Sequence, residues 1–272
     1  MTSVRTPGPR TGSAFDLARS EGRATLVGYL PAGFPDVPGA IEALRTMVDC
    51  GCDVIEIGLP YSDPVMDGPT IQDAAQRALE GGFRTSDVIR TVEAVAATGA
   101  PTLVMTYWNP VERYGVERFA RDLASAGGAG LITPDLTPDS AEGWIAAADA
   151  HDLDKVFLVA PSSTEERLRY TAQACRGFVY ATAVMGVTGT RATTSDLAGP
   201  LVERTRAVTE LPIGVGLGVS NGEQAAQVAA YADGVIVGSA FVRVLLDAED
   251  KASGLKALGA LTEDLASGVR RG

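Results

Sequence analysis

Short apolar runs alternate along this chain with segments whose apolar residues recur at helical spacing. Turn residues bound eight of these runs, as is typical of buried strands. The eight predicted strands cover residues 24–29, 53–59, 102–106, 130–133, 155–160, 178–183, 213–216 and 234–237. The predicted helices cover residues 37–48, 70–79, 86–97, 115–126, 139–150, 163–175, 195–209, a segment after the seventh strand, and 255–269. Ser86 and Thr164 are the expected caps of two of them.

Eight strands joined by helical crossovers favour a closed, parallel (β/α)₈ TIM barrel at this length. A doubly wound open sheet is the alternative, but it needs no eighth strand and usually opens with a Gly-rich turn. We therefore expect one catalytic barrel domain over residues 14–272, with an extra helix in the loop after the second strand. Residues 1–13 contain Pro, Gly and Arg without an apolar core, and we expect a mobile tail there.

Composition narrows the function classes. The net charge of −11 argues against a nucleic-acid partner. No segment approaches the ~20 apolar residues needed to cross a membrane, and the first residues lack the apolar stretch of a secretory signal. We therefore expect a cytoplasmic protein without a membrane partner. Its three cysteines, Cys50, Cys52 and Cys175, are predicted to be buried, reduced thiols.

The second predicted strand contains a carboxylate at an inward position. Alternation along a strand puts Val54, Glu56 and Gly58 on one face, so Glu56 points into an apolar layer. A buried carboxylate without partners is costly and often functional. Asp67 follows in a loop rich in Pro and Gly. The two are either an acid–base pair or a turn residue and a strand end at solvent, and this stretch alone leaves both readings open.

The barrel fold favours the acid–base pair over the turn interpretation, because active sites of such barrels lie at the carboxyl ends of the strands. Polar residues after several strands converge there, which favours catalysis; they include Glu56, the 63–67 loop, residues 107–109, Asp135, Tyr180 and the 185–191 loop. The loops 216–220 and 238–240, after strands seven and eight, are rich in Gly and predict a phosphate site.

The lack of lysine and histidine at the carboxyl ends of the predicted strands argues against two other kinds of chemistry. Only three lysines occur, and none is expected in the site, which argues against a Schiff-base aldolase. The single histidine, His151, precedes the fifth strand at the opposite end, so a multi-histidine zinc site is excluded. We therefore predict no metal and no cofactor, with proton transfer by Glu56 and Asp67.

Residues 56–72 resemble the signature of tryptophan synthase alpha subunits. The motif reads Glu56-x-Gly58-x-Pro60-Tyr61-Ser62-Asp63-Pro64-x-x-Asp67-Gly68-Pro69-x-Ile71-Gln72, and the likeness continues at 105–110, 134–136, 186–189 and 238–239. The resemblance implies the retro-aldol cleavage of indole-3-glycerol phosphate to indole and glyceraldehyde 3-phosphate in tryptophan biosynthesis. It also implies that Glu56 is the general acid–base and that Asp67 binds the indole N–H.

The same resemblance implies the remaining site residues and the partner. The substrate-binding positions are Tyr29 and Tyr180 around the indole and glycerol groups, with Thr188, Gly189, Gly218, Gly238 and Ser239 toward the phosphate. The implied partner is a beta subunit, in an α₂β₂ heterotetramer, and the pyridoxal phosphate belongs to that subunit. Asp63, Pro64 and Asn109 match positions that meet it.

Three alternatives stay open at this point. The chain is a free-standing lyase that releases indole without a partner, or a non-catalytic, regulatory paralogue that binds a phosphate ligand. The third is another phosphosugar isomerase or aldolase on the same barrel, which would not explain the loop from Asp63 to Asp67.

Overall fold

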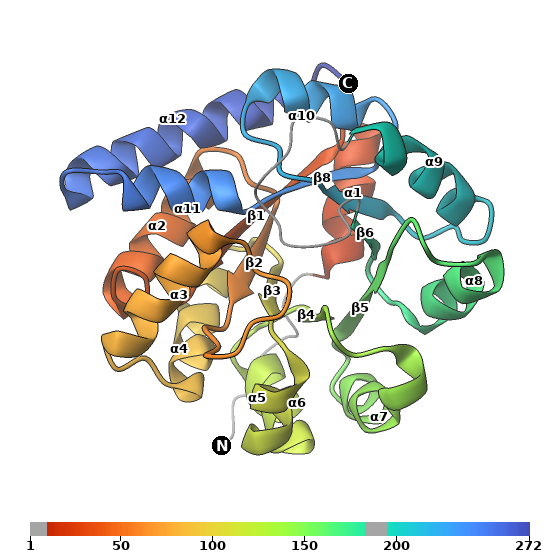
Figure 1. Cartoon of the computed structure of the whole chain (residues 1–272), viewed down its shortest axis with the longest axis horizontal. Helices are drawn as coiled ribbons and strands as arrows, with labels where there is room; N and C mark the ends of the chain where they lie inside the picture. The colour runs from red at the N-terminus through yellow and green to blue at the C-terminus, as the bar shows by residue number, and fades with distance from the viewer. Residues whose placement is uncertain (1–9, 183–194) are drawn as a thin grey trace.

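The computed structural model describes residues 10–182 and 195–272, and its strands form a closed parallel barrel in the order β1 to β8 (Figure 1). Each strand pairs with its sequence neighbours, and β1 closes the ring against β8. The strands are β1 (Thr25–Pro31), β2 (Val54–Gly58), β3 (Thr102–Met105), β4 (Gly130–Thr133), β5 (Asp154–Val159), β6 (Val179–Thr182), β7 (Ile213–Gly216) and β8 (Gly234–Val237). The predicted fold class and all eight predicted strands are confirmed.

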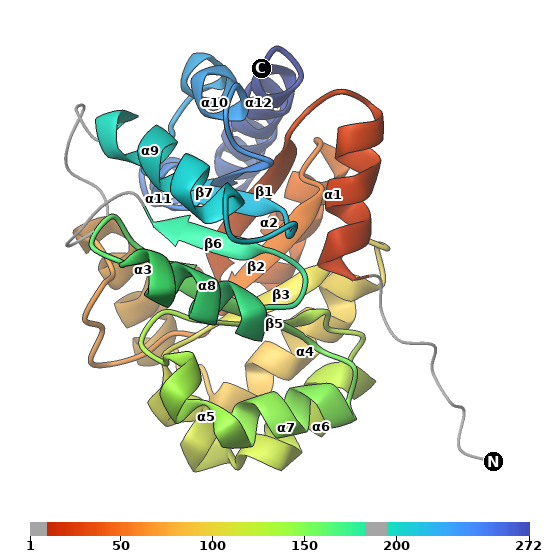
Figure 2. The same cartoon turned by 90° about the vertical axis from the view of Figure 1, so that its right-hand side faces the viewer.

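Helices surround the barrel, and two of them lie between β2 and β3 (Figures 1 and 2). This confirms the extra helix predicted after the second strand. The helices are α1 (Thr11–Ser20), α2 (Val37–Asp49), α3 (Pro69–Glu80), α4 (Thr85–Ala96), α5 (Trp108–Tyr114), α6 (Val116–Ser125), α7 (Glu142–Ala150), α8 (Glu165–Ala174), α9 (Ser195–Arg206), α10 (Gly222–Ala229), α11 (Ser239–Leu246) and α12 (Lys251–Val269), with a 3₁₀ turn at Pro138–Ser140.

Local sequence explains how several helices begin. The predicted cap of α8 is confirmed, because the Thr164 hydroxyl accepts a hydrogen bond from the Arg167 amide. The cap predicted at Ser86 is wrong, since α4 begins one residue earlier. There the Asp87 carboxylate accepts from the Arg84 amide and closes the first turn.

Three helices differ from expectation, and one of them, α11, lies between the eighth strand and the predicted helix 255–269. Helix α1 begins at Thr11, inside the segment 1–13 that was predicted as a tail, while residues 1–9 lie outside the described residues. Helix α5 occupies a segment that was predicted as a loop, and it includes Asn109. The cysteines are free, as predicted, but only Cys52 is fully buried.

The core has an outer and an inner layer, because both faces of the sheet are covered. Helices cover the outside of the strands, and inward-pointing side chains from successive strands, such as Val54 and Phe178, fill the interior. Phe15 of α1 joins this inner layer, with its ring centroid 5.1 Å from that of Phe178. Helix α1 therefore closes the amino-terminal end of the barrel (Figure 2).

A buried carboxylate anchors this closing helix. Asp154, at the start of β5, is 1 % exposed and accepts hydrogen bonds from the Thr11 amide (3.0 Å) and hydroxyl (2.5 Å). The carboxyl ends of the strands are left open for a site. None of the helices in the described ranges is both long and apolar enough to cross a membrane.

Candidate active site

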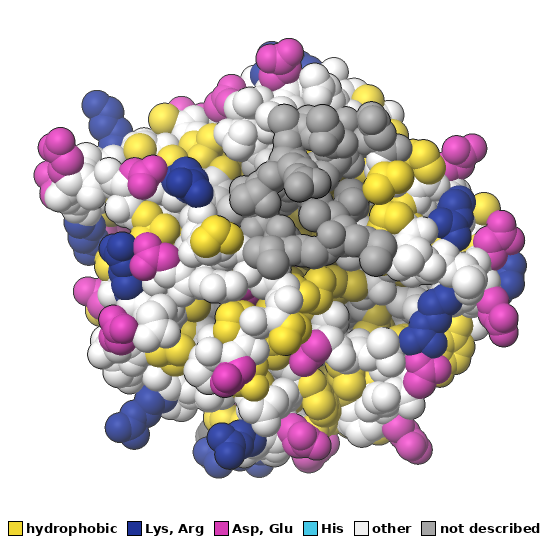
Figure 3. All heavy atoms as spheres, in the orientation of Figure 1, with side chains coloured by type: hydrophobic (Ala, Val, Ile, Leu, Met, Phe, Trp, Pro, Cys, Tyr) yellow, Lys and Arg dark blue, Asp and Glu magenta, His cyan; other side chains and the backbone are white. Residues whose placement is uncertain are grey.

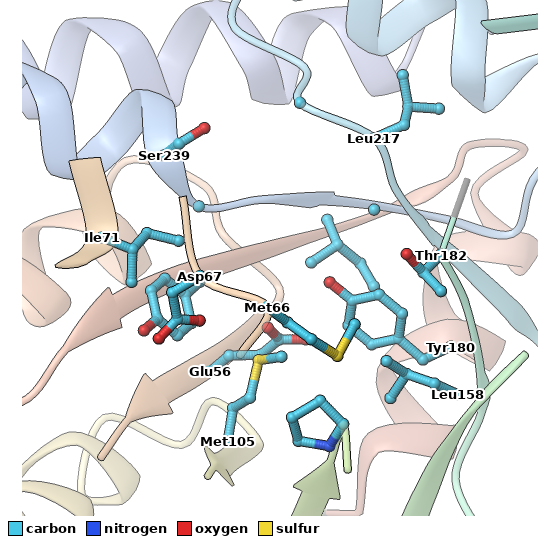
Figure 4. Close-up of a pocket in the computed structure, with 16 residues that line it drawn as sticks. Glu56, Met66, Asp67, Ile71, Met105, Leu158, Tyr180, Thr182, Leu217 and Ser239 are labelled. Atoms are coloured by element: carbon cyan, nitrogen blue, oxygen red, sulfur yellow. The ribbon is translucent and has the colours of Figure 1, made fainter. Parts of the chain in front are cut away.

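A cavity opens at the carboxyl ends of the strands (Figure 4). Every strand, or the loop after it, contributes to its wall. The lining residues are Tyr29, Glu56, Met66, Asp67, Ile71, Met105, Pro134, Leu158, Tyr180, Thr182, Gly216, Leu217, Gly218, Ile236, Gly238 and Ser239. The lining, mostly apolar with a few polar groups, is that of a pocket for a small organic molecule. The structure thus brings together seven of the predicted site residues: Tyr29, Glu56, Asp67, Tyr180, Gly218, Gly238 and Ser239.

Glu56 lies at the inner end of this cavity. Its register partners are Tyr29 on β1 and Leu103 on β3, so its side chain faces the barrel interior. The side chain is fully buried, and neither carboxylate oxygen has a hydrogen-bond partner among the described residues. This burial raises the pKa of Glu56 from 4.5 to about 8. Glu56 therefore holds a proton at neutral pH and can donate it into the cavity.

Asp67 reaches the cavity from the loop between β2 and α3. The hydroxyl oxygen of Tyr107, which follows β3, accepts a hydrogen bond from the Met66 amide at 2.9 Å and also bonds the Asp67 carboxylate. Burial raises the pKa of Asp67, and the Tyr107 bond opposes that rise. Burial and the Asp67 charge together raise the pKa of Tyr107 to about 12, so Tyr107 keeps its proton.

Two buried tyrosines complete the inner wall, and each packs over a glycine. A Cβ at Gly58 would lie 2.2 Å from the Tyr29 hydroxyl oxygen, and one at Gly216 would lie 2.5 Å from that of Tyr180. Only glycine leaves room for these rings. Burial, and then the nearby carboxylates, raises the pKa of both tyrosines, so both hydroxyls remain hydrogen-bond donors.

The side of the cavity next to α11 has the features of an anion site. Gly238 is the N-cap of α11 and Ser239 its first residue, and both line the cavity. Figure 4 shows Ser239 on the same side of the cavity as Asp67. Gly218 has a φ of +82°, which a side chain would strain. Free amides of a helix start and glycine-rich turns favour phosphate. The predicted positions Thr188 and Gly189 lie outside the described residues.

The residues predicted to meet a partner lie around the cavity mouth. Asp63 and Asn109 are exposed and Pro64 is half-buried. The Asn109 amide donates to the Tyr61 hydroxyl at 3.0 Å, which joins α5 to the loop that carries Asp67. Val65 in this loop is 71 % exposed. On this face, Figure 3 shows exposed hydrophobic side chains near the centre and Lys and Arg mainly at the edge.

Sequence reasoning missed some features of the site and placed others only roughly. It put Tyr107 at the correct end of the barrel but assigned it no role, although an aromatic residue directly after a strand is a usable signal. Asp135 is also at this end, but its carboxylate accepts from the Trp108 amide (3.0 and 3.1 Å) at the start of α5 and does not line the cavity. Within the described ranges, no group of three or more His, Cys, Asp or Glu could hold a metal ion.

Comparisons with known proteins agree with this geometry. A family model for the tryptophan synthase alpha chain matches residues 15–270. The tryptophan synthase alpha chain of Salinispora tropica is 64 % identical over 261 residues, 96 % of this chain and 98 % of that protein. That of Mycobacterium intracellulare is 57 % identical over 271 residues, 100 % of this chain and 98 % of that protein.

Solved structures give the same result. A chain in a structure of Mycobacterium tuberculosis tryptophan synthase superposes with a TM-score of 0.91 at 57 % identity, covering 97 % of this chain and 100 % of that one. The tryptophan synthase alpha subunit of Legionella pneumophila superposes with a TM-score of 0.87 at 32 % identity, covering 96 % of this chain and 98 % of that one.

Proposed function

The chain belongs to the tryptophan synthase alpha chain family, and we propose that Glu56 and Asp67 carry out its lyase reaction. That reaction cleaves indole-3-glycerol phosphate to indole and glyceraldehyde 3-phosphate in tryptophan biosynthesis. One observation carries the assignment of residues: a protonated, unpartnered Glu56 lies inside the cavity, and the Asp67 carboxylate reaches the same cavity from a loop.

Glu56 supplies and then accepts a proton. Its carboxyl group protonates C3 of the indole ring, because a carbon that leaves with its bonding electrons needs an acid beside it. The resulting carboxylate then takes the proton of the adjacent glycerol hydroxyl. The bond between C3 and the glycerol carbon breaks, its electrons restore the aromatic indole, and the hydroxyl carbon becomes the aldehyde. Glu56 ends the cycle protonated, as it began.

Asp67 stabilises the charge that this step creates. Protonation at C3 leaves positive charge on the indole nitrogen, and a carboxylate that accepts a hydrogen bond from that N–H stabilises it. Tyr107 supports this role, because its bond to Asp67 favours the charged carboxylate.

The other cavity residues bind and orient the substrate. Tyr29 and Tyr180 flank the indole and glycerol groups, while Gly218, Gly238 and Ser239 receive the phosphate at the start of α11. Thr188 and Gly189 belong to the same proposal through the family resemblance alone. None of these steps draws on a metal or an organic cofactor in this chain.

The proposed partner is a tryptophan synthase beta subunit, in an α₂β₂ complex that would hold the pyridoxal phosphate in beta. Exposed Val65, Asp63 and Asn109, around the cavity mouth, support a docking surface there. We place this complex in the cytoplasm. Exposed hydrophobic side chains near the centre of this face, with Lys and Arg mainly at its edge, also support a docking surface with a polar rim (Figure 3).

The first test measures indole release from indole-3-glycerol phosphate, with and without a beta subunit. We expect weak activity alone and a large rise with beta. High activity that beta leaves unchanged would indicate a free-standing lyase, and no indole under either condition would indicate a non-catalytic paralogue.

Substitution at Glu56 tests the assigned role. Glu56→Gln keeps the size of the side chain but removes the acid, so we expect turnover to fall by at least about a hundredfold. Glu203→Gln, on the exposed surface of α9, is the matched control and should leave turnover unchanged. Unchanged turnover in Glu56→Gln, with a native circular dichroism spectrum, would refute the assignment.

A further inference from the structure

One side-chain hydrogen bond joins α11 to α3, two helices far apart in the sequence. Arg243 on α11 donates from Nη2 to Oγ1 of Thr70 on α3, over 2.6 Å and a sequence separation of 173 residues. The two helices pack against each other, and Thr70 is 8 % exposed. The bond is short and non-local; its acceptor residue Thr70 is buried, whereas its donor residue Arg243 is exposed.

Both ends of this bond lie one turn or less from the proposed substrate contacts. Arg243 comes four residues after Ser239, so the two lie on the same face of α11, and Arg243 points back toward its start. Thr70 is the second residue of α3, which follows directly on Asp67 and Gly68. Figure 4 shows Ser239, Ile71 and Asp67 along the same side of the cavity.

The choice of partner distinguishes this bond from the surface ion pairs. Within the described ranges Arg243 forms no salt bridge, although the chain carries an excess of carboxylates. Its guanidinium instead donates to a neutral hydroxyl on the first turn of α3. A hydrogen bond from a charged donor is stronger than one between neutral groups, so it can hold the first turn of α3 in one place relative to α11.

A second bond continues from that turn to the catalytic loop. The side-chain amide of Gln72 on α3 donates from Nε2 to the Asp67 carbonyl oxygen at 2.7 Å, so the backbone of Asp67 is tied to the start of α3. A continuous path of contacts thus runs from the start of α11 through Arg243, Thr70 and the first turn of α3 to Asp67.

We propose that Arg243 and Thr70 are positioning residues that couple phosphate binding at the start of α11 to the placement of Asp67. This inference rests on the function proposed above. A phosphate held by Gly238 and Ser239 fixes α11, and the Arg243–Thr70 bond transmits that position to Asp67. Binding energy from a group that does not react is thereby used at the reacting ring.

Steady-state kinetics with the beta subunit present test the coupling. Thr70→Val keeps the shape but removes the hydroxyl, and Arg243→Leu removes the donor. Each should lower kcat about tenfold, since one hydrogen bond is lost, and KM should change much less. The double variant should be no slower than either single one, because both remove the same bond.

Two further variants distinguish a role in positioning Asp67 from a general loss of protein stability. Thr70→Ser restores the hydroxyl and should recover most of the lost rate. Arg77→Leu, on α3 but in an exposed ion pair with Asp73, should leave kcat within about twofold. A bond that only packs the helices would lower thermal stability in Thr70→Val and leave kcat unchanged. That result, or single effects that multiply in the double variant, would overturn the inference.

Hydrogen exchange tests the coupling without turnover. Glycerol 3-phosphate is the probe, and exchange is followed in peptides covering residues 62–70. We expect the probe to slow exchange there in the native chain but not in Thr70→Val. Equal slowing in both, or none in the native chain, would overturn the coupling. Lack of indole release by the native chain with beta would instead count against the proposed function, so the two failures are distinguishable.

Discussion

Burial of Glu56 gives the free energy of unfolding a specific dependence on pH. The pKa of Glu56 is about 8 in the folded chain, against 4.5 for an ordinary glutamate. Below the lower value, both states carry the proton and the group has no differential effect. Between the two values the unfolded chain releases the proton while the folded chain keeps it, so stability falls as pH rises.

The gap between these values sets the size of the effect. Between the unfolded and folded pKa values, the contribution of Glu56 to the free energy of unfolding falls by about 1.4 kcal/mol per pH unit. The total fall is about 5 kcal/mol. Glu56→Gln does not titrate, so its stability lacks this component. We therefore expect the difference in unfolding free energy, Glu56→Gln minus native, to rise by about 3 kcal/mol between about pH 5.5 and about pH 7.5.

Urea unfolding of both proteins, followed by far-ultraviolet circular dichroism, measures this difference. Other carboxylates titrate equally in the two proteins and cancel. The exposed Glu203→Gln variant is the control, and its difference from the native chain should not change over the same range. A difference for Glu56→Gln that is flat with pH would refute the raised pKa, and with it the argument that Glu56 is the resident acid.

Three further outcomes are expected from single substitutions. Asp67→Asn removes the charge that faces the indole nitrogen, so indole release should fall by at least about a hundredfold; a loss below threefold would contradict that role. Tyr107→Phe removes the hydroxyl that holds Asp67 and the Met66 amide, and kcat should fall about tenfold with little change in the urea midpoint. Asp154→Asn weakens the attachment of α1 through Thr11, and should cost about 2 kcal/mol of unfolding free energy while leaving kcat unchanged; loss of kcat with native stability would argue against a purely structural role.

Local pattern was sufficient for the strands and most helices. All eight strands are short apolar runs between turn residues, because both faces of a barrel strand are buried. Of the three helices that the sequence pattern missed, α1, α5 and α11, the first two depend on distant residues. Helix α1 is held by Asp154, 143 positions from Thr11, and by Phe15 in the barrel interior. The first turn of α5 is satisfied by Asp135, which follows β4. Neither contact is visible in a window of neighbouring residues.

The site residues also divide into those that the local sequence pattern predicts and those whose placement depends on distant residues. Strand alternation placed Glu56 in the interior, and barrel topology placed Asp67 beside it, but the orientation of the loop depends on Tyr107, which follows another strand. The Arg243–Thr70 bond likewise joins residues that no local pattern relates. The sequence pattern therefore predicts the position of site residues that lie on strands. The position of site residues that lie in loops can be seen only in the tertiary structure.

The two carboxyl groups differ because the barrel puts them in different surroundings. Glu56 is fixed on a strand with no hydrogen-bond donor among the described residues, and burial alone sets its pKa. Asp67 is on a loop, only partly buried, and Tyr107 opposes the effect of burial on its pKa. A proton is therefore kept by the group beside the carbon that must be protonated, and negative charge is favoured on the group beside the nitrogen that becomes positive. If Tyr107 donated to Glu56 instead, both the acid and the counter-charge would be weakened.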